Sequence, residues 1–237
     1  MTPITTIPTR ASTLAILGVI STVNAKLYPH PFFAKEGRPF IVGGLVLTIL
    51  FWLIDWGFLA TIALILTIFC AQFFRDPARE LPSDPRAVVS PVDGRVCKVQ
   101  LGVDPLTNEP AKMVSIFMNL FNVHSQKAPV SGVVEEIRYT PGLFVNADLD
   151  KASTDNERNA VRVKTDDGKT VTFVQVAGLV ARRILCYANV GERLERGQRY
   201  GFIRFGSRVD VYLPMEAEVT VSIGDKVTGV MTPIARL

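Results

Sequence analysis

Cysteine and histidine are both scarce in this sequence. Three cysteines (Cys70, Cys97 and Cys186) and two histidines (His30 and His124) occur among 237 residues. The cysteines lie far apart, and no pair has the C-x-x-C spacing of a structural zinc site. This pattern argues against a zinc centre or a disulfide framework, and it is typical of a reducing compartment. We therefore expect no metal in this protein.

Charged residues are missing from two long segments. Residues 40–54 and 58–74 contain no Asp, Glu, Lys or Arg, and Asp55-Trp56-Gly57 separates them. Each segment is slightly shorter than the roughly 20 residues that a straight membrane span requires. The pattern predicts a helical hairpin over 40–74 that inserts into a bilayer, and a hairpin buried in a protein core is the alternative. Asp55 is expected at the turn rather than as a functional acid inside the membrane.

Basic residues flank this predicted hairpin on both sides. Lys26, Lys35 and Arg38 precede it, and Arg75 and Arg79 follow it. The positive-inside rule then places both ends of the hairpin in the cytoplasm, on the inner face of the cell membrane. The formal net charge of +4 suits an anionic membrane surface, and no nucleic-acid-binding motif is present.

The rest of the chain divides by composition. Residues 1–39 are expected to form a loosely structured N-terminal segment, in which His30 lies between two prolines and faces the surface. Residues 75–86 are rich in proline and charge and predict a linker. Residues 87–237 form the predicted β domain, because alternating apolar runs are separated there by turn pairs such as Asp93-Gly94.

Two segments of the β region repeat a pattern. Both 90–99 and 128–137 contain Pro-Val-x-Gly-x-Val, a tight turn that leads into a strand. The repeats predict a mainly β fold, a β-sandwich or flattened barrel of the kind that biotinyl and lipoyl carrier domains use. A non-enzymatic, membrane-tethered carrier or adaptor is therefore one functional hypothesis. Against it, no Met-Lys-Met attachment motif occurs, and Lys226 lies in the tail rather than at a central hairpin.

Five motifs in order support a different hypothesis. They are FFRDPAR (73–79), SPVDG (90–94), FNVHSQKAPVSG (121–132), QVAGLVARRI (175–184) and RYGFIRFGSRVDVYLP (199–214). Together they resemble the short-type phosphatidylserine decarboxylase proenzymes, and the resemblance runs from about residue 27 to the C-terminus. It implies an enzyme at the membrane that converts phosphatidylserine to phosphatidylethanolamine and CO₂.

The resemblance also implies a cofactor made from the chain itself. Ser207 would attack the carbonyl of Gly206 and split the chain into 1–206 and 207–237, which stay together as a heterodimer. Glycine suits the position before the serine, because that attack needs a bent, open backbone. The remnant of Ser207 would become a pyruvoyl group that forms a Schiff base with the substrate amine, so that no pyridoxal phosphate is needed.

The resemblance points to His124 and Asp93 as partners of Ser207. By itself the sequence leaves His124 as a surface residue or a base, and Asp93 as a turn residue or the group that orients a catalytic side chain. The long-type family pattern is His-x-x-His-x-Pro, whereas this chain has Lys127 at the second position. The base for self-cleavage therefore stays open between His124 and Lys127. Phe205-Gly206-Ser207-Arg208 replaces the long-type Leu-Gly-Ser-Thr and fits the short type.

The substrate head group carries a phosphate and a carboxylate, which guanidinium groups bind in bidentate fashion. Candidate residues for this contact are Arg182, Arg183, Arg204 and Arg208, with plain surface charge as the alternative. The segment 117–121, FMNLF, is predicted to be a core strand, with an apolar lip against lipid as the alternative.

Overall fold

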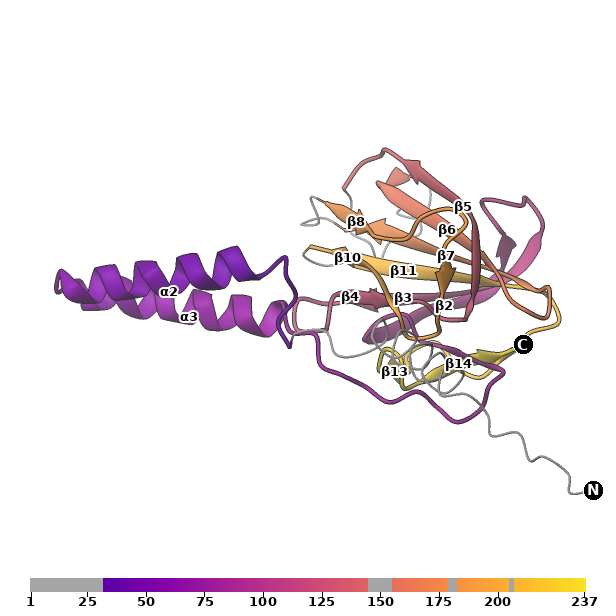
Figure 1. The fold of residues 1–237 in the computed structure, drawn as a ribbon, viewed down its shortest axis with the longest axis horizontal. Coiled ribbons are helices and arrows are strands. Elements are labelled where there is room, and N and C mark those ends of the chain that lie inside the picture. Colours follow the sequence, from indigo (N-terminus) through magenta and orange to yellow (C-terminus); the bar gives the residue numbers. More distant parts are fainter. Residues whose placement is uncertain (1–31, 145–154, 179–182, 205–206) are drawn as a thin grey trace, which may run out of the picture.

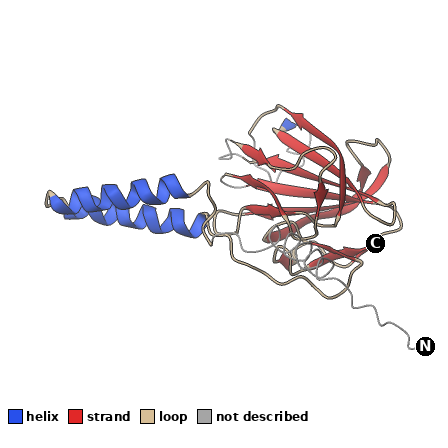
Figure 2. Ribbon diagram, viewed as in Figure 1, coloured by secondary structure: helices blue, strands red, loops and turns tan. Residues whose placement is uncertain are grey.

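The computed structural model describes residues 32–144, 155–178, 183–204 and 207–237. Two long helices extend from one end of a body made of strands (Figures 1 and 2). The expected mainly β architecture is confirmed. Several predicted features lie outside the described residues: most of the N-terminal segment with His30, and the residues Arg182, Phe205 and Gly206.

The helices α2 (Arg38–Leu53) and α3 (Gly57–Phe73) lie side by side (Figure 1). Gly44 of α2 permits their close approach, since a Cβ atom there would collide with the Thr67 hydroxyl of α3. Asp55 connects the two helices with a φ of 57°, in the left-handed region that short polar residues tolerate in turns. It is therefore a turn residue, as the sequence predicts.

Both helices expose apolar side chains along most of their length. No residue of α2 is buried, and the buried residues of α3 are Ala60, Thr67 and Phe73. Near the tip, Trp52 is 69% exposed and Phe58 is 79% exposed. In the part of the chain that the structure describes, no helix combines the length and the hydropathy needed to cross a membrane.

One sheet of eight antiparallel strands forms most of the β body and curls around the core (Figure 1). Its strands, in spatial order, are β13 (Lys226–Val227), β2 (Gly94–Val103), β3 (Pro110–Met118), β11 (Ser207–Leu213), β7 (Thr170–Ala177), β6 (Arg158–Lys164), β5 (Gly132–Thr140) and β9 (Arg193–Leu194). The core between the layers is dominated by valine, as β-branched residues suit a pleated, buried surface.

Two small sheets complete the body. The first consists of β4 (Ser125–Lys127), β10 (Arg199–Ile203) and β8 (Ile184–Cys186), and the second of β1 (Ala87–Val89), β14 (Pro233–Arg236) and β12 (Glu218–Val219). The first sheet lies at the end of the body that carries the helices (Figure 1). There Phe73 and Phe74 of the helical segment pack with Ala34 and Phe202 in one buried apolar cluster.

The strand β11 holds the central place in the large sheet. It pairs with β3 on one side and β7 on the other, and all seven of its residues are buried. It begins at Ser207, so the segment 207–237 supplies a central strand together with β12, β13 and β14. This segment is therefore bound to the body by two complete ladders of main-chain hydrogen bonds.

The two Pro-Val-x-Gly-x-Val segments have equivalent positions. Gly94 opens β2 and Gly132 opens β5, and each lies directly against the neighbouring strand. A Cβ atom would collide with the carbonyl of Phe117 at Gly94 and with the carbonyl of Lys164 at Gly132. The glycines thus permit close strand contact. The likeness of these repeats to biotinyl or lipoyl domains stays a prediction.

Candidate active site

Ser207 is the first residue of the central strand β11. Its side chain is buried, and its hydroxyl oxygen has no hydrogen-bond partner. The serine faces Met118 of β3 and Ala177 of β7 across the sheet. A hydroxyl that is buried without a partner costs stability, and such groups are rare enough to need an explanation. A role of the Ser207 hydroxyl in a reaction would explain why it is buried without a partner.

His124 is also buried, although the sequence leaves it as a surface residue or a base. Its Nδ1 atom lies 2.9 Å from the carbonyl oxygen of Asn122, while its Nε2 atom is buried and has no partner. Burial lowers the pKa of His124 from 6.5 to about 4, against the opposing effect of the Asn122 hydrogen bond. The ring is therefore neutral at pH 7. A carbonyl only accepts, so Nδ1 carries the hydrogen and Nε2 offers a free lone pair.

The topology brings His124 and Ser207 to the same end of the body. Met118 pairs with Ser207 between β3 and β11, and Ser125 pairs with Phe202 between β4 and β10. The turn that contains His124, between β3 and β4, therefore begins next to Ser207 at the start of β11 and ends next to Phe202 of β10.

Helix α3 covers the imidazole of His124. The ring of Phe73, fully buried at the end of α3, lies 4.1 Å from the His124 ring, centroid to centroid. Gln72 and Arg75 both donate to the carbonyl of Phe121, in the turn that precedes the histidine. The end of the hairpin thus forms one wall of the candidate site and excludes water from the His124 imidazole.

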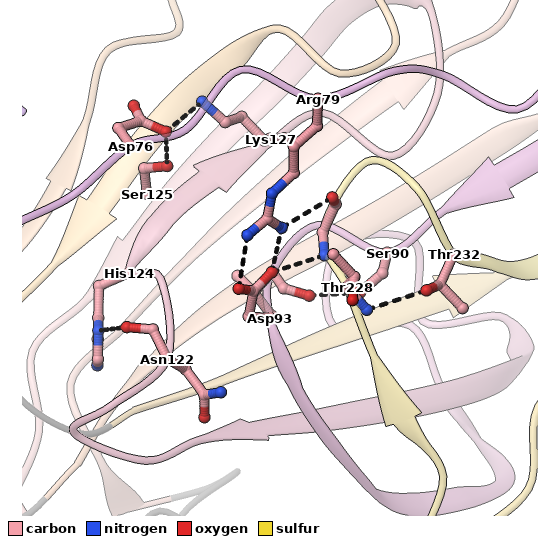
Figure 3. Close-up of polar contacts among 12 residues, drawn as sticks. Asp76, Arg79, Ser90, Asp93, Asn122, His124, Ser125, Lys127, Thr228 and Thr232 are labelled. Atoms are coloured by element: carbon pink, nitrogen blue, oxygen red, sulfur yellow. Dashed lines mark hydrogen bonds and ion pairs between the residues drawn. The ribbon is translucent and has the colours of Figure 1, made fainter. Parts of the chain in front are cut away.

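Asp93 lies in the SPVDG turn and binds an arginine rather than the histidine. Its carboxylate forms a bidentate ion pair with Arg79, and it accepts a hydrogen bond from the Gly229 amide at 2.8 Å (Figure 3). The bond that orients the His124 ring comes from Asn122. The Asp93 carboxylate favours the charged form of His124 only weakly, as the least of the influences on its pKa. In this structure Asp93 fastens the segment 75–86 to the C-terminal tail.

Lys127 is buried in a second polar cluster (Figure 3). Its ammonium group lies 3.0 Å from Asp76, and the same carboxylate oxygen accepts from the Ser125 hydroxyl at 2.6 Å. Burial lowers the pKa of Lys127, and Asp76 opposes that shift. Arg199 joins the cluster, with 3.6 Å to Asp76 and 2.7 Å to the buried Glu36. Lys127 is therefore held beside the Asp76 carboxylate, three residues after His124.

Sequence reasoning missed the contributions of the segment 75–86, which it treats as a linker. Arg75, Asp76 and Arg79 all come from the FFRDPAR motif, and each contacts a group of the site. Asp76 is only 1% exposed, which a solvated linker would not show. The available signal was that FFRDPAR is one of the five motifs that carry the family resemblance.

The predicted substrate-binding arginines differ in their surroundings. Arg208 is fully buried and forms an ion pair with Asp210 at 2.8 Å within the sheet, and its predicted contact with substrate stays a prediction. Arg183 is exposed. The guanidinium of Arg204 lies 5.6 Å from the centroid of the Phe40 ring, and its buried Nε atom has no partner. Arg182 lies outside the described residues.

Within those described residues, no group of three or more His, Cys, Asp or Glu side chains is arranged to hold a metal ion. Several buried polar atoms of the described residues lack a partner, and two of them, Ser207 Oγ and His124 Nε2, can act as a nucleophile and as a base. A serine hydroxyl becomes a nucleophile when an unprotonated imidazole accepts its proton, and this end of the body supplies one group of each kind.

Known proteins match this chain over most of its length. The family model described as phosphatidylserine decarboxylase matches residues 66–235. A phosphatidylserine decarboxylase proenzyme of Neisseria gonorrhoeae (strain NCCP11945) is 59% identical over 212 residues, covering 90% of this chain and 82% of the relative. The proenzyme of the same name from Cupriavidus taiwanensis is 56% identical over 211 residues, covering 89% and 98%. The chain belongs to the phosphatidylserine decarboxylase family.

Proposed function

We propose that Ser207 is the residue from which this decarboxylase makes a pyruvoyl group. The protein is an enzyme of a self-processing family that removes CO₂ from phosphatidylserine and leaves phosphatidylethanolamine. No relative supports the carrier or adaptor hypothesis. The observation that carries the proposal is that Ser207 Oγ and His124 Nε2 are both buried without a hydrogen-bond partner, on segments that the strand pairing brings to the same end of the body.

In this proposal His124 is the base for Ser207. Its neutral ring takes the hydroxyl proton at Nε2, and the Asn122 carbonyl holds Nδ1–H and fixes the tautomer. Ser207 Oγ then attacks the carbonyl carbon of Gly206, and the amide becomes an ester as the nitrogen of Ser207 takes a proton. Loss of the α-proton of residue 207 expels the Gly206 carboxylate. Water then replaces the nitrogen, which leaves as ammonia.

The residues around Ser207 fit the group that this sequence of steps would leave there. Ser207 lies between the apolar residues Met118 and Ala177 of the neighbouring strands, and His124, at the same end of the body, stays unprotonated at pH 7. When present, a pyruvoyl group supplies an electron sink for the carbanion that loss of CO₂ creates. His124 is placed to hold or return a proton at Nε2 during turnover.

Lys127 has a supporting place in the proposal. Its ammonium group is bound to Asp76, and the Ser125 hydroxyl shares that carboxylate, so the strand that follows His124 is fixed. His124 has an unpartnered base atom, which favours it over Lys127 as the base for self-cleavage. We propose that Lys127 and Asp93 position the site rather than transfer protons.

We also propose that α2 and α3 lie in the bilayer and hold the β body at its surface. The exposed apolar residues of both helices would be costly in water, and the tip residues Trp52, Trp56 and Phe58 are all more than half exposed. The basic residues near the two ends of the hairpin favour the cytoplasmic face of the inner membrane. A substrate lipid could then reach the site while its acyl chains stay in the bilayer.

The intact mass of the purified protein tests this function. We expect wild-type protein to give two chains, 1–206 and a pyruvoyl-blocked 207–237, that co-elute under native conditions. They would separate only in denaturant, because β11 is bound on both sides. Ser207→Ala should give one intact chain with no decarboxylase activity on phosphatidylserine vesicles. A cleaved Ser207→Ala protein, or an active uncut wild type, would overturn the proposal.

A further inference from the structure

Arg75, a cationic side chain beside the site, forms no ion pair among the described residues, and the Asp93 carboxylate that attracts it from a distance is already paired with Arg79. Arg75 is half-buried where the hairpin meets the β body. Its Nη1 atom donates to the carbonyl of Gln72 at 2.7 Å, and its Nη2 atom donates to the carbonyl of Phe121 at 2.9 Å. Both acceptors are neutral, so the positive charge of Arg75 is not compensated by them, in contrast with Arg79 and Arg199, which are ion-paired.

Arg75 and His124 are attached to the same turn. The guanidinium binds the carbonyl of Phe121, and the imidazole binds the carbonyl of the next residue, Asn122. Adjacent Cα atoms are about 3.8 Å apart, so the two side chains lie within about 10 Å of one another. The charge of Arg75 also contributes to the lowered pKa of His124, as expected for neighbouring groups.

The groups around this turn follow a definite order. Phe121 is 66% exposed, and its ring packs edge-on against Phe69 of α3 with 6.4 Å between centroids. Arg75 is half-buried and binds the main chain of the same residue, and His124, three residues further on, is fully buried. Burial thus increases from the apolar ring of Phe121 through the cation of Arg75 to the imidazole of His124. A phospholipid has the same order of acyl chains, phosphodiester and head group.

We propose that Arg75 binds the phosphodiester of the phospholipid and thereby directs the head group toward His124 and Ser207. The inference rests on the proposed function and identifies the contact by which the substrate is recognised. A guanidinium suits it, because two parallel N–H groups match two phosphate oxygens, and charge-assisted bonds of this type are strong. The contact acts on binding and involves no proton transfer.

The first test compares kinetics of processed enzymes on phosphatidylserine vesicles. Arg75→Gln keeps a donor for the Phe121 carbonyl and removes the charge. We expect complete chain cleavage, at least a tenfold higher KM and a kcat within threefold of the wild type. Arg38→Gln is the matched control, because Arg38 is an exposed cation at the same end of the hairpin, and it should change KM less than twofold. An unchanged KM in Arg75→Gln, or a loss confined to kcat, would overturn the inference.

The second test measures binding without turnover. Uncleaved Ser207→Ala protein is titrated with soluble short-chain phosphatidylserine and with short-chain phosphatidylethanolamine, which keeps the phosphodiester and lacks the carboxylate. Arg75→Gln should weaken both at least tenfold. A loss for phosphatidylserine alone would assign Arg75 to the carboxylate and refute the proposal. An inactive wild type would refute the proposed function, while this titration would still decide the role of Arg75.

If thermal melting shows that Arg75→Gln folds poorly, a third variant keeps the inference testable. Arg75→Lys keeps the charge and loses the planar pair of donors. It should fold, process completely and raise KM at least threefold, because a lysine binds phosphate as a point charge only. A wild-type KM in a folded Arg75→Lys enzyme would count against the phosphodiester contact.

Discussion

Burial decides the chemistry of single residues in this protein. His124 in water would be about half protonated near pH 6.5, but its pKa is lowered to about 4 because the ring is desolvated. The same histidine in an exposed turn would be a weaker candidate, since part of it would be protonated and water would occupy Nε2. The hydrogen bond from Nδ1 to Asn122 then selects the tautomer with the reactive lone pair.

This burial predicts how stability depends on pH. Between pH 6.5 and about 4 the unfolded His124 binds a proton and the folded one does not, so the free energy of unfolding falls as the pH falls through that window. The effect is about 2 kcal/mol between pH 7 and pH 5. Urea denaturation of uncleaved Ser207→Ala protein, with and without His124→Gln, measures it. The His124→Gln protein should lose about 2 kcal/mol less. Equal losses in both proteins would mean that His124 is not buried as described.

At the scale of elements, glycine decides where strands meet. Gly94 opens β2 against the carbonyl of Phe117, and a side chain would force the two strands apart. The neighbouring turn carries Asp93, whose pairing with Arg79 holds the segment 75–86 against the body. A shift of β2 would therefore also displace the segment 75–86, which contains Arg75 and Asp76.

Gly94→Ala is expected to lower the free energy of unfolding by at least about 2 kcal/mol, because the new methyl group meets backbone that cannot move alone. Gly102→Ala in the same strand is the matched control. The atoms nearest to a Cβ there, on Met113 and Tyr212, lie at 3.9 Å, so the change should stay within about 0.5 kcal/mol. Urea denaturation in the Ser207→Ala background compares them. Similar values for both variants would contradict the close approach at Gly94.

At the scale of the whole molecule, an apolar hairpin and a polar β body share one interface at the active site. Phe73 and Phe74 pack with Phe202 of β10, and Phe73 also covers His124. The hairpin that we propose to lie in the bilayer thus also forms one wall of the candidate active site. Attachment to the membrane and access of a lipid to the site are consequences of the same contact.

The proposed membrane attachment predicts a flotation result. Leu53 and Phe58 are 65% and 79% exposed near the hairpin tip. Leu53→Asp/Phe58→Asp should reduce flotation with phosphatidylserine-containing vesicles at least tenfold, since each charge costs about 2–3 kcal/mol in the hydrocarbon. The control Leu101→Asp, on the β body at 67% exposure, should float as the wild type does. Undiminished flotation of the tip variant would assign membrane binding to the β body.

The sequence by itself determined the class of fold, the turn at Asp55 and the family. Alternating apolar residues, two charge-free segments and ordered motifs are local properties, and local properties can be read along a chain. The junction at Gly206-Ser207 and the importance of His124 also followed from motifs, as predictions.

The tertiary structure decided which residues meet. Arg208 stands next to Ser207 in sequence, but adjacent residues in a strand face opposite sides, and the arginine is neutralised by Asp210. Asp93 binds Arg79, while Asp76 of the expected linker binds Lys127. Such pairings depend on which segments the fold brings together and on how far burial strengthens each ion pair. Neither quantity is a property of a short stretch of sequence.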